Sequence, residues 1–338
     1  MELSKPRNDD RKLWDVIFGI YAYPAVLLAH HLKLFSLLAK QPRSLDEVAT
    51  TLGIAARPTQ AILSAAASLG FLHLRDDRYA LTPIAEDYLL EDSPTYFGRL
   101  LDLIIDSYPV ASFESIKRAV LTDSAQVIPG REIYESNKNS KEGARAFTRA
   151  MHSHSMAAAL AWPDKVDLSR YVTMLDIGGG SGAHSIAAAL RWPNLRATVF
   201  DLGQVCEVAR ELITGYQMTD RVGTQAGDMW ADPFPAADVH LYSAIFMDWP
   251  PERCRMLARK SFESLPRGGR IIVHQMLYND DKTGPFAAAA FSIIVLLFTS
   301  GQSYTGQELT EMLTAAGFTN IAVTPTFGYW SMVTAVKP

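Results

Sequence analysis

The sequence predicts an α/β fold in which a seven-stranded, mostly parallel sheet follows a mostly helical N-terminal domain. Two observations support this. From about Tyr171 onward, apolar segments with strand character alternate with helical segments, which is the pattern of a parallel sheet covered by helices. Up to about Trp162, apolar residues recur at steps of three and four, which is the period of helices. We therefore expect a helical domain over residues 1–162 and an α/β domain over residues 163–338.

The composition is that of a globular protein without a strong electrostatic bias. With 338 residues the chain is long enough for a core in each domain, and its net charge of −4 argues against a broad nucleic-acid-binding face. Its two cysteines, Cys206 and Cys254, fall within predicted elements of the α/β domain. We therefore expect no disulfide framework.

We expect neither a signal peptide nor a membrane span. Residues 1–5 lack the apolar core of a signal peptide. The most membrane-like run, Phe286–Phe298, is about thirteen residues long and contains Ser292, whereas a spanning helix needs about twenty apolar residues. We expect this run to be a buried helix, and the protein to be cytoplasmic with no membrane partner.

A segment over about residues 36–90 of the N-terminal domain has the order of elements of a winged helix. Ser44 and Glu47 have the spacing of a capping box, and Gly53 is the expected left-handed stop. The expected elements are helices over 45–52 and about 58–69 and strands over 71–74 and 78–81. Winged helices often bind DNA, but the second helix is rich in alanine and has only Arg57 at its start. A structural or dimerising role is therefore expected, without a nucleic-acid partner.

The α/β domain is expected to contain seven strands. They lie at 172–177, 196–201, 222–226, 238–244, 270–276, about 319–325 and about 330–336. The last two are joined by a short turn near Gly328, so one of them is expected to run antiparallel. A helix over 306–316 is expected to start after Thr305 and to stop at Gly317.

The most informative motif is the run LDIGGGSG at residues 175–182, between the first of these strands and a helix from about Ala183. Glycines allow the backbone to approach a ligand closely, and the start of the helix offers free N–H groups. A second acid, Asp201, ends the next strand. This is the layout of a Rossmann-like nucleotide site.

This motif has three possible interpretations: a dinucleotide site, a site for S-adenosylmethionine, or a turn that binds no ligand. Gly178 and Gly180, together with Asp201 at the distance of a ribose-binding acid, also satisfy a relaxed dinucleotide fingerprint. Asp176 distinguishes the two cofactors, because a carboxylate beside the turn would repel a pyrophosphate. It would instead suit the ammonium group of S-adenosylmethionine (SAM). We interpret the turn as a SAM site, with a purely structural turn as the remaining alternative.

Further motifs accompany this turn, and together they make the chain resemble a known family. They are GDM at 227–229, DW at 248–249, LPRGG at 265–269 and LTAAGF at 313–318. With the winged helix, they resemble the plant-type O-methyltransferases of the caffeate and hydroxyindole kind and their bacterial small-molecule relatives. The resemblance implies the class I SAM-methyltransferase fold. It also implies a homodimer through the N-terminal domain, with Tyr21 and Tyr23 near the partner.

The resemblance implies cofactor contacts residue by residue. The methionine part of SAM would be held by Asp176, Gly178, Gly180 and Gly182, and by the backbone of Ser243. Asp201 would bind the ribose hydroxyls. The adenine ring would pack against Leu202 and Met229, and its exocyclic amine would bind Asp228. For Asp228 a simple turn acid is the alternative, and for Met229 core packing is the alternative.

The chain departs from the family at the position of its usual base. Relatives that methylate a hydroxyl carry a histidine directly before the Asp-Trp pair, whereas here Met247 precedes Asp248. A methionine cannot accept a proton at any useful pH. Where an acid often follows the fifth strand, the chain has His274 and Gln275.

Three accounts of the chemistry remain open. An acceptor that is already nucleophilic needs no base, and transfer then depends on holding it in line with the methyl group. Alternatively, His152 or His154 on the helix that resembles the substrate-lining segment replaces the base, with Asp248 as a tentative third catalytic residue. Their spacing of two places the histidines on different helix faces, so at most one is expected to enter the pocket. Thirdly, the protein binds SAM without transferring methyl.

The acceptor pocket is expected to be apolar and aromatic. The expected lining residues are Tyr108, Phe113, Met151, Phe246, Met247, Trp249, Phe291 and Phe298, and the same segments carry Met156, Trp162, Ile294 and Tyr304. Core packing is the alternative for each. We expect no metal site, because His184, His240 and His274 are interpreted as individual loop or strand residues without ligand spacing.

The sequence thus predicts a cytoplasmic, homodimeric SAM-dependent methyltransferase acting on a small aromatic or polyketide-like metabolite. Oxygen is the leading acceptor. The alternatives are an N- or C-methyltransferase of the same fold, a SAM-binding enzyme that does not methylate, and a transcription regulator.

Overall fold

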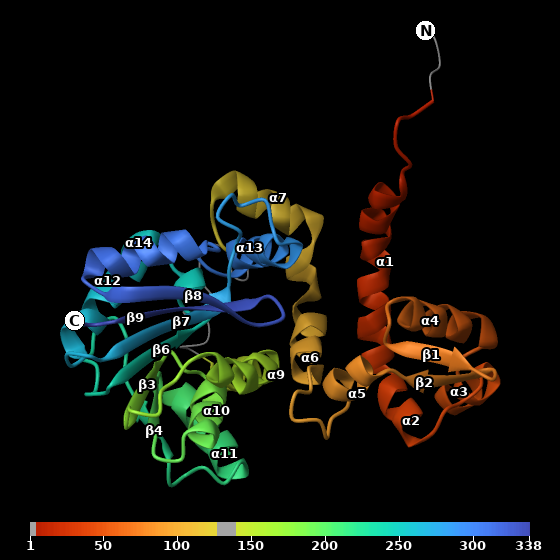
Figure 1. Cartoon of the computed structure of the whole chain (residues 1–338). Helices are drawn as coiled ribbons and strands as arrows, with labels where there is room; N and C mark the ends of the chain where they lie inside the picture. The colour runs from red at the N-terminus through yellow and green to blue at the C-terminus, as the bar shows by residue number, and fades with distance from the viewer. Residues whose placement is uncertain (1–4, 127–139) are drawn as a thin grey trace. The chain divides into compact units, whose positions relative to one another are not determined.

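The computed structural model describes residues 5–126 and 140–338, and Figure 1 shows its ribbon. By their contacts the residues form two compact units, Met1–Ile105 and Asp106–Pro338. The sequence predicts residues 106–162 in the N-terminal domain, whereas the described residues of this range, 106–126 and 140–162, group with the sheet by their contacts.

The N-terminal unit is helical apart from one hairpin. Its elements are α1 (Arg11–His31), α2 (Leu34–Lys40), α3 (Leu45–Leu52), α4 (Ala56–Ser68), β1 (Leu72–Arg75), β2 (Arg78–Leu81), α5 (Pro83–Leu89) and the first part of α6 (Gly98–Ser107). The predicted capping box is confirmed, because Ser44 Oγ accepts from the Glu47 N–H and the Glu47 carboxylate accepts from the Ser44 N–H. Gly53 ends α3 in the left-handed conformation, with φ 66°. The predicted helices and hairpin are therefore present in the predicted order.

Helix α1 differs from the sequence-based expectation about apolar segments. It is long and apolar enough to cross a membrane, and among the described residues it is the one such helix of sufficient length. It, and not Phe286–Phe298, is thus the most membrane-like segment. Its apolar side chains are largely exposed, including Trp14 and Tyr21.

The second unit contains the seven-stranded sheet. The strands are β3 (Thr173–Ile177), β4 (Arg196–Asp201), β5 (Val222–Ala226), β6 (Val239–Ser243), β7 (Arg270–Met276), β8 (Thr319–Phe327) and β9 (Trp330–Val336). Their order in the sheet is β5-β4-β3-β6-β7-β9-β8, and β9 runs antiparallel to both of its neighbours. The predicted strands and the antiparallel terminal hairpin are therefore confirmed.

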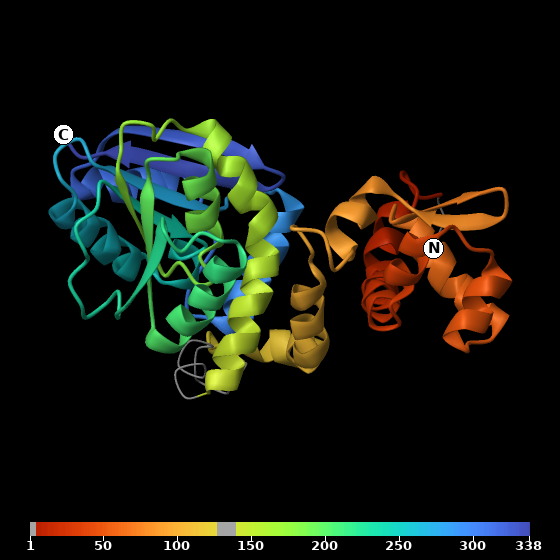
Figure 2. The ribbon, with the colours of Figure 1, turned by 90° about the horizontal axis from the view of Figure 1, so that it is seen from below.

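Helices cover both faces of this sheet. They are α7 (Phe113–Thr122), α9 (Lys141–Ala161), α10 (Ala183–Arg191), α11 (Gly203–Gly215), α12 (Pro251–Ser264), α13 (Phe286–Phe298) and α14 (Gly306–Ala316), with the short helices η1 (Tyr108–Ala111), η2 (Trp162–Lys165) and η3 (Phe246–Asp248). Figure 1 shows α12 and α14 over one face and α9, α10 and α11 over the other. Figure 2 shows α9 running alongside α10 and α11. These contacts explain why α9 belongs to the sheet unit.

Helix α13 was expected to be buried, and this expectation is wrong. Only Ala288, Val295 and Leu297 of its residues are buried, while Phe286 is 87% exposed. The helix packs on α7 and η1, and Phe291 stacks on His154 of α9. Apolar composition alone therefore misjudged its burial.

The order of the strands determines where a ligand site lies. The chain leaves β3 to build β4 and β5 on one side and returns to build β6 and β7 on the other. Ligands of open α/β sheets bind beside the carboxyl ends of the strands at such a switch point. Asp176 lies near the carboxyl end of β3, and Ser243 ends the neighbouring strand β6.

Candidate active site

The glycine turn after β3 is shaped by backbone conformations that favour glycine. Gly178, Gly180 and Gly182 all have positive φ angles, of 66°, 55° and 78°. The Gly178 N–H donates to the Phe200 carbonyl of β4 at 2.8 Å. A Cβ added to Gly180 would meet no atom of the described structure within 4 Å, so the turn presents open backbone there.

Asp176 is fully buried and only half satisfied. Its Oδ2 accepts a hydrogen bond from Ser185 Oγ of α10 at 2.8 Å. Within the described part of the chain, its Oδ1 has no hydrogen-bond partner. Burial, with a smaller contribution from the charge of Asp201, raises the pKa of Asp176 to about 7. A buried acceptor of this kind is suited to a ligand that carries hydrogen-bond donors and a positive charge.

Asp201 anchors the turn from the end of β4. Its Oδ2 accepts from the Gly180 N–H at 2.9 Å, and its Oδ1 accepts from the Leu202 N–H at 2.7 Å. Burial raises the pKa of Asp201 to about 6 although these bonds oppose the shift. Each carboxylate oxygen can accept a further hydrogen bond, so Asp201 can still receive ligand hydroxyls.

These observations fit a cofactor with a cationic amine and a ribose. The unpartnered oxygen of Asp176 would receive the amine, and the remaining acceptor capacity of Asp201 would receive the hydroxyls. The open space beside Gly180 leaves room for the part of the cofactor that joins its amine to its ribose. The residues predicted for SAM therefore lie together at one end of β3 and β4.

The loop after β5 carries the residues expected at the adenine. Asp228 Oδ1 accepts from the Trp230 N–H at 2.9 Å, so this carboxylate also closes a turn. Met229 packs against the core while its carbonyl accepts from Lys260 Nζ at 2.7 Å. Lys260 also donates to the Asp232 carbonyl at 2.6 Å. Lys260 was not predicted as a site residue, because the sequence around it gives no sign that α12 lies next to this loop.

Beside the carboxyl ends of β6 and β7, a group of buried histidines corrects one sequence-based interpretation. His184 lies in α10, where its Nε2 is 2.7 Å from Ser243 Oγ. Its ring packs edge-on against that of His274, with centroids 5.3 Å apart. His274 is a strand residue as predicted, but His184 lies in a helix and the two rings are in contact, so they are not individual residues. Among the described residues, no group of three His, Cys, Asp or Glu side chains is placed to hold a metal ion.

The segment after β6 buries the side chain that directly precedes the Asp-Trp pair. Met247 in η3 is 2% exposed, whereas Asp248 is partly exposed. Gly301 packs so tightly against this segment that an added Cβ would overlap the backbone of residues 247–249. Tyr304 Oη donates to the Trp249 carbonyl at 2.8 Å, which fixes the end of the segment.

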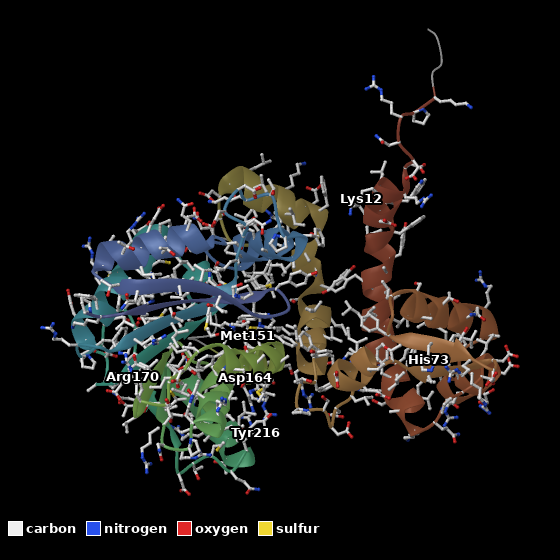
Figure 3. The ribbon with its side chains drawn as sticks, viewed as in Figure 1. Lys12, His73, Met151, Asp164, Arg170 and Tyr216 are labelled. Atoms are coloured by element: carbon white, nitrogen blue, oxygen red, sulfur yellow. The ribbon has the colours of Figure 1, made fainter. Side chains whose placement is uncertain are left out.

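The two histidines of α9 point to different partners. His152 contacts Ser181 of the turn and Tyr216 after α11, with Nδ1 3.0 Å and Nε2 3.1 Å from the two hydroxyl oxygens. His154 stacks on Phe291 of α13 and lies against Trp330 of β9, with ring centroids 6.2 and 5.3 Å apart. Burial lowers the pKa of both imidazoles to about 4, helped at His152 by a neighbouring arginine. Figure 3 labels Met151 on α9, the neighbour of His152 in the sequence, and Tyr216 directly after α11.

The residues expected to line the acceptor pocket divide into two groups. Met151, Phe291 and Phe298 are partly exposed, and Tyr108, Phe113 and Ile294 are more than one third exposed. They lie on η1, α7, α9 and α13, and both η1 and α7 pack on α13. The others, Met156, Trp162, Phe246, Met247, Trp249 and Tyr304, are buried in the core. The partly exposed group thus gathers around α13 and the stacked pair of His154 and Phe291.

Comparisons with known proteins show which family the chain resembles. The O-methyltransferase domain family matches residues 113–319, and the O-methyltransferase dimerisation domain family matches residues 14–91. A 3-hydroxy-5-methyl-1-naphthoate 3-O-methyltransferase of Streptomyces sahachiroi is 34% identical over 91% of this chain and 89% of its own. The tetracenomycin polyketide synthesis 8-O-methyl transferase TcmO of Streptomyces glaucescens is 31% identical over 95% and 94%. The crystal structure of human N-acetylserotonin methyltransferase with SAM matches with a TM-score of 0.85, at 26% identity over 99% of both chains.

Relatives that methylate other atoms match as well. An L-tyrosine C(3)-methyltransferase of Streptomyces lavendulae is 29% identical over 90% of this chain and 85% of its own. The N,N-dimethyltransferase OxyT of Streptomyces rimosus is 30% identical over 80% of each chain. The likeness therefore extends over nearly the whole chain, whichever atom is methylated. The chain belongs to the SAM-dependent O-methyltransferase family that combines a methyltransferase domain with an N-terminal dimerisation domain.

Proposed function

We propose that this enzyme transfers the methyl group of SAM to an oxygen of a small aromatic or polyketide-like metabolite, without a histidine base. Two relatives named above carry O-methyltransferase names with a naphthoate and a polyketide, which supports this acceptor class. The partly exposed aromatic residues around α13 support it too, because flat apolar acceptors need such surfaces.

One observation carries the absence of a base. Met247 directly precedes the Asp-Trp pair, where the resemblance implies the family's histidine, and its buried thioether can take no proton. His154 is the titratable group beside the aromatic residues, but its pKa is lowered to about 4. Proton transfer from a phenol with a pKa of about 10 to such an imidazole would cost roughly 8 kcal/mol of free energy. An acceptor that arrives ionised, or that needs no deprotonation, avoids this cost.

In this proposal the protein contributes binding and alignment. SAM supplies an electrophilic methyl group on a sulfonium. Asp176 and the turn 178–182 would bind its amino-acid end, Asp201 would bind the ribose, and the loop with Asp228 and Met229 would enclose the adenine. Phe291 and Tyr108 would hold the flat acceptor and orient its nucleophilic atom toward the cofactor. Such alignment can supply several kcal/mol of rate acceleration.

Nitrogen and carbon are the alternative acceptors, and the relatives of S. lavendulae and S. rimosus support them. A neutral amine or an activated ring carbon also needs no histidine base. The position of the label in the product decides between these alternatives.

We also propose that the enzyme is a homodimer. Helix α1 exposes a long apolar surface within the residues that match the dimerisation domain: Leu13, Trp14, Val16, Ile17, Phe18, Ile20, Tyr21 and Tyr23. Apolar surface of this extent usually marks an interface. Light scattering coupled to gel filtration is expected to give the mass of two chains.

The activity is tested with SAM that carries a trideuterated methyl group and a panel of phenolic, naphthoic and polyketide-derived acceptors. Mass spectrometry is expected to show the label on an acceptor oxygen, and the Asp201→Ala variant is expected to show none. Label on nitrogen or carbon would replace the acceptor assignment. Binding of SAM with no label in any acceptor or in a metabolite extract would contradict methyl transfer.

A further inference from the structure

The imidazole of His152 is held at both nitrogens. Its Nδ1 lies 3.0 Å from Ser181 Oγ within the turn 178–182, and its Nε2 lies 3.1 Å from Tyr216 Oη. The rings of His152 and Tyr216 also contact each other, with centroids 5.6 Å apart. His152 therefore joins α9 to the cofactor turn and to the end of α11.

Together these two contacts use the full hydrogen-bonding capacity of a neutral imidazole. Burial, together with the charge of Arg149, lowers the pKa of His152 to about 4, so the ring is uncharged near neutral pH. A neutral imidazole offers one donor and one acceptor, and the two hydroxyls can take the complementary roles in either tautomer. No ring nitrogen is left to deprotonate an acceptor, so His152 is not suited to act as a base.

The turn has separate anchors on its two sides. On the β4 side, Gly178 donates to the Phe200 carbonyl and Gly180 donates to the Asp201 carboxylate. On the other side, the buried Ser181 is held by His152. Without the second anchor, the three turn glycines with positive φ would have more conformational freedom.

Helix α9 is itself fixed next to this anchor. Arg145 forms a two-pronged ion pair with Glu211 of α11, with N–O distances of 2.8 and 2.6 Å. Arg149 adds a contact with the same carboxylate at 3.2 Å. His152 thus projects from a helix that is tied to α11, next to Tyr216. A rigid support of this kind is what an accurate binding turn needs.

We propose that His152 is a positioning residue for cofactor binding: through Ser181 it sets the turn 178–182 before the cofactor arrives, and Tyr216 orients its ring. This inference rests on the proposed placement of the methionine end of SAM at that turn. It assigns the two neighbouring histidines of α9 to different sides of the reaction, His152 to the cofactor and His154 to the acceptor.

The test is direct binding of S-adenosylhomocysteine by isothermal titration calorimetry, together with steady-state kinetics. His152→Ala and Ser181→Ala are each expected to weaken binding about three- to tenfold, the effect of losing one hydrogen bond. The double variant is expected to be little weaker than either single variant, because both remove the same contact. The KM for SAM rises, while kcat at saturating SAM and its pH profile stay within about twofold.

Two conservative variants test the geometry. His152→Asn keeps a polar group near the position of Nδ1 and is expected to recover most of the affinity. His152→Gln reaches toward the position of Nε2 and is expected to recover less. His73→Ala, a histidine substitution on β1 of the other unit, is the matched control and is expected to bind as the wild type does.

Several results would overturn this assignment. Wild-type affinity in both His152→Ala and Ser181→Ala would remove the positioning role. A large fall in kcat with unchanged binding and an altered pH profile would make His152 a catalytic base instead. Equal binding by the wild type and Asp201→Ala would show that the proposed cofactor site itself is wrong. Circular dichroism of each ligand-free variant confirms that it is folded.

Discussion

Ser185 Oγ donates to one oxygen of the buried Asp176 carboxylate at 2.8 Å, and the other oxygen has no partner among the described residues. The carboxylate can therefore bind a cationic group of a ligand at the end of β3, where the described residues supply no cation. Its pKa is raised to about 7 and that of Asp201 to about 6, so protons compete with a cationic ligand for this site.

This competition predicts how cofactor binding depends on pH. Above pH 7 Asp176 is ionised and attracts the ammonium group, whereas below pH 7 binding must first expel a proton. The affinity for S-adenosylhomocysteine is therefore expected to fall as the pH is lowered from 8 to 6, by up to about tenfold per unit below pH 7. Calorimetry in buffers of different ionisation enthalpy is expected to detect proton release at pH 7.

Asp176→Asn is the control for this effect. The variant should bind weakly at every pH and release no proton at this site. The raised pKa of Asp176 also makes the ligand-free wild type lose stability as the pH rises from about 4, the ordinary pKa of an aspartate, to about 7, because over this range the folded state keeps a proton that the unfolded state has released. Identical pH dependence in the variant and the wild type would contradict the assignment.

The ammonium of Lys260 predicts a second effect on the cofactor. It donates to the carbonyls of Met229 and Asp232 and lies 4.3 Å from the centre of the Phe234 ring. Lys260→Met keeps the apolar stem but leaves both carbonyls without this donor. We expect the affinity for S-adenosylhomocysteine to fall about tenfold, with a smaller loss of stability. Arg259→Met, which removes the neighbouring exposed cation, is expected to change neither the affinity nor the stability. Equal effects of the two variants would refute a specific role of Lys260 in cofactor binding.

Gly301 predicts an effect on stability. A Cβ at this position would overlap backbone atoms of residues 247–249, which a side-chain rotation cannot relieve. Gly301→Ala is expected to lower the melting temperature by roughly 5 °C or more, and to lower activity because the same segment contains Met247, at the position that the resemblance implies for the family's base. Gly215→Ala, at the last residue of α11 with open space around its Cβ, should be neutral or slightly stabilising. Calorimetry that finds Gly301→Ala as stable as Gly215→Ala would contradict this packing.

Local patterns explain how much of the fold was predictable. The strands and the capped helices each carry their own signal in a few consecutive residues, such as Ser44 and Glu47. The turn 178–182 was predictable for the same reason. Strand β8 extends to Phe327, beyond its predicted end, because pairing with β9 continues there. Such an extension depends on the partner strand and not on the local pattern.

The unpredicted features all depend on contacts between distant segments. His184 of α10 meets His274 of β7 because it also contacts Ser243 of β6, which pairs with His274 in the sheet, and no local pattern encodes these contacts. Lys260 reaches the loop after β5 from α12 for a similar reason. The burial of α13 was misjudged because its composition is apolar on all sides, so the sequence does not indicate which side the protein covers.

Met247 offers the most direct test of transfer without a base. Met247→Leu conserves volume in a buried position, so the fold should lose less than about 1.5 kcal/mol. Because the methionine carries no proton, kcat/KM is expected to stay within about threefold of the wild type, and the rate should follow the ionisation of the acceptor itself. Rates for phenols of different pKa, measured from pH 6 to 9, check this dependence. A thousandfold loss in a folded Met247→Leu variant would contradict this account of the position, and one pH profile shared by all acceptors would show that a protein group takes part in proton transfer.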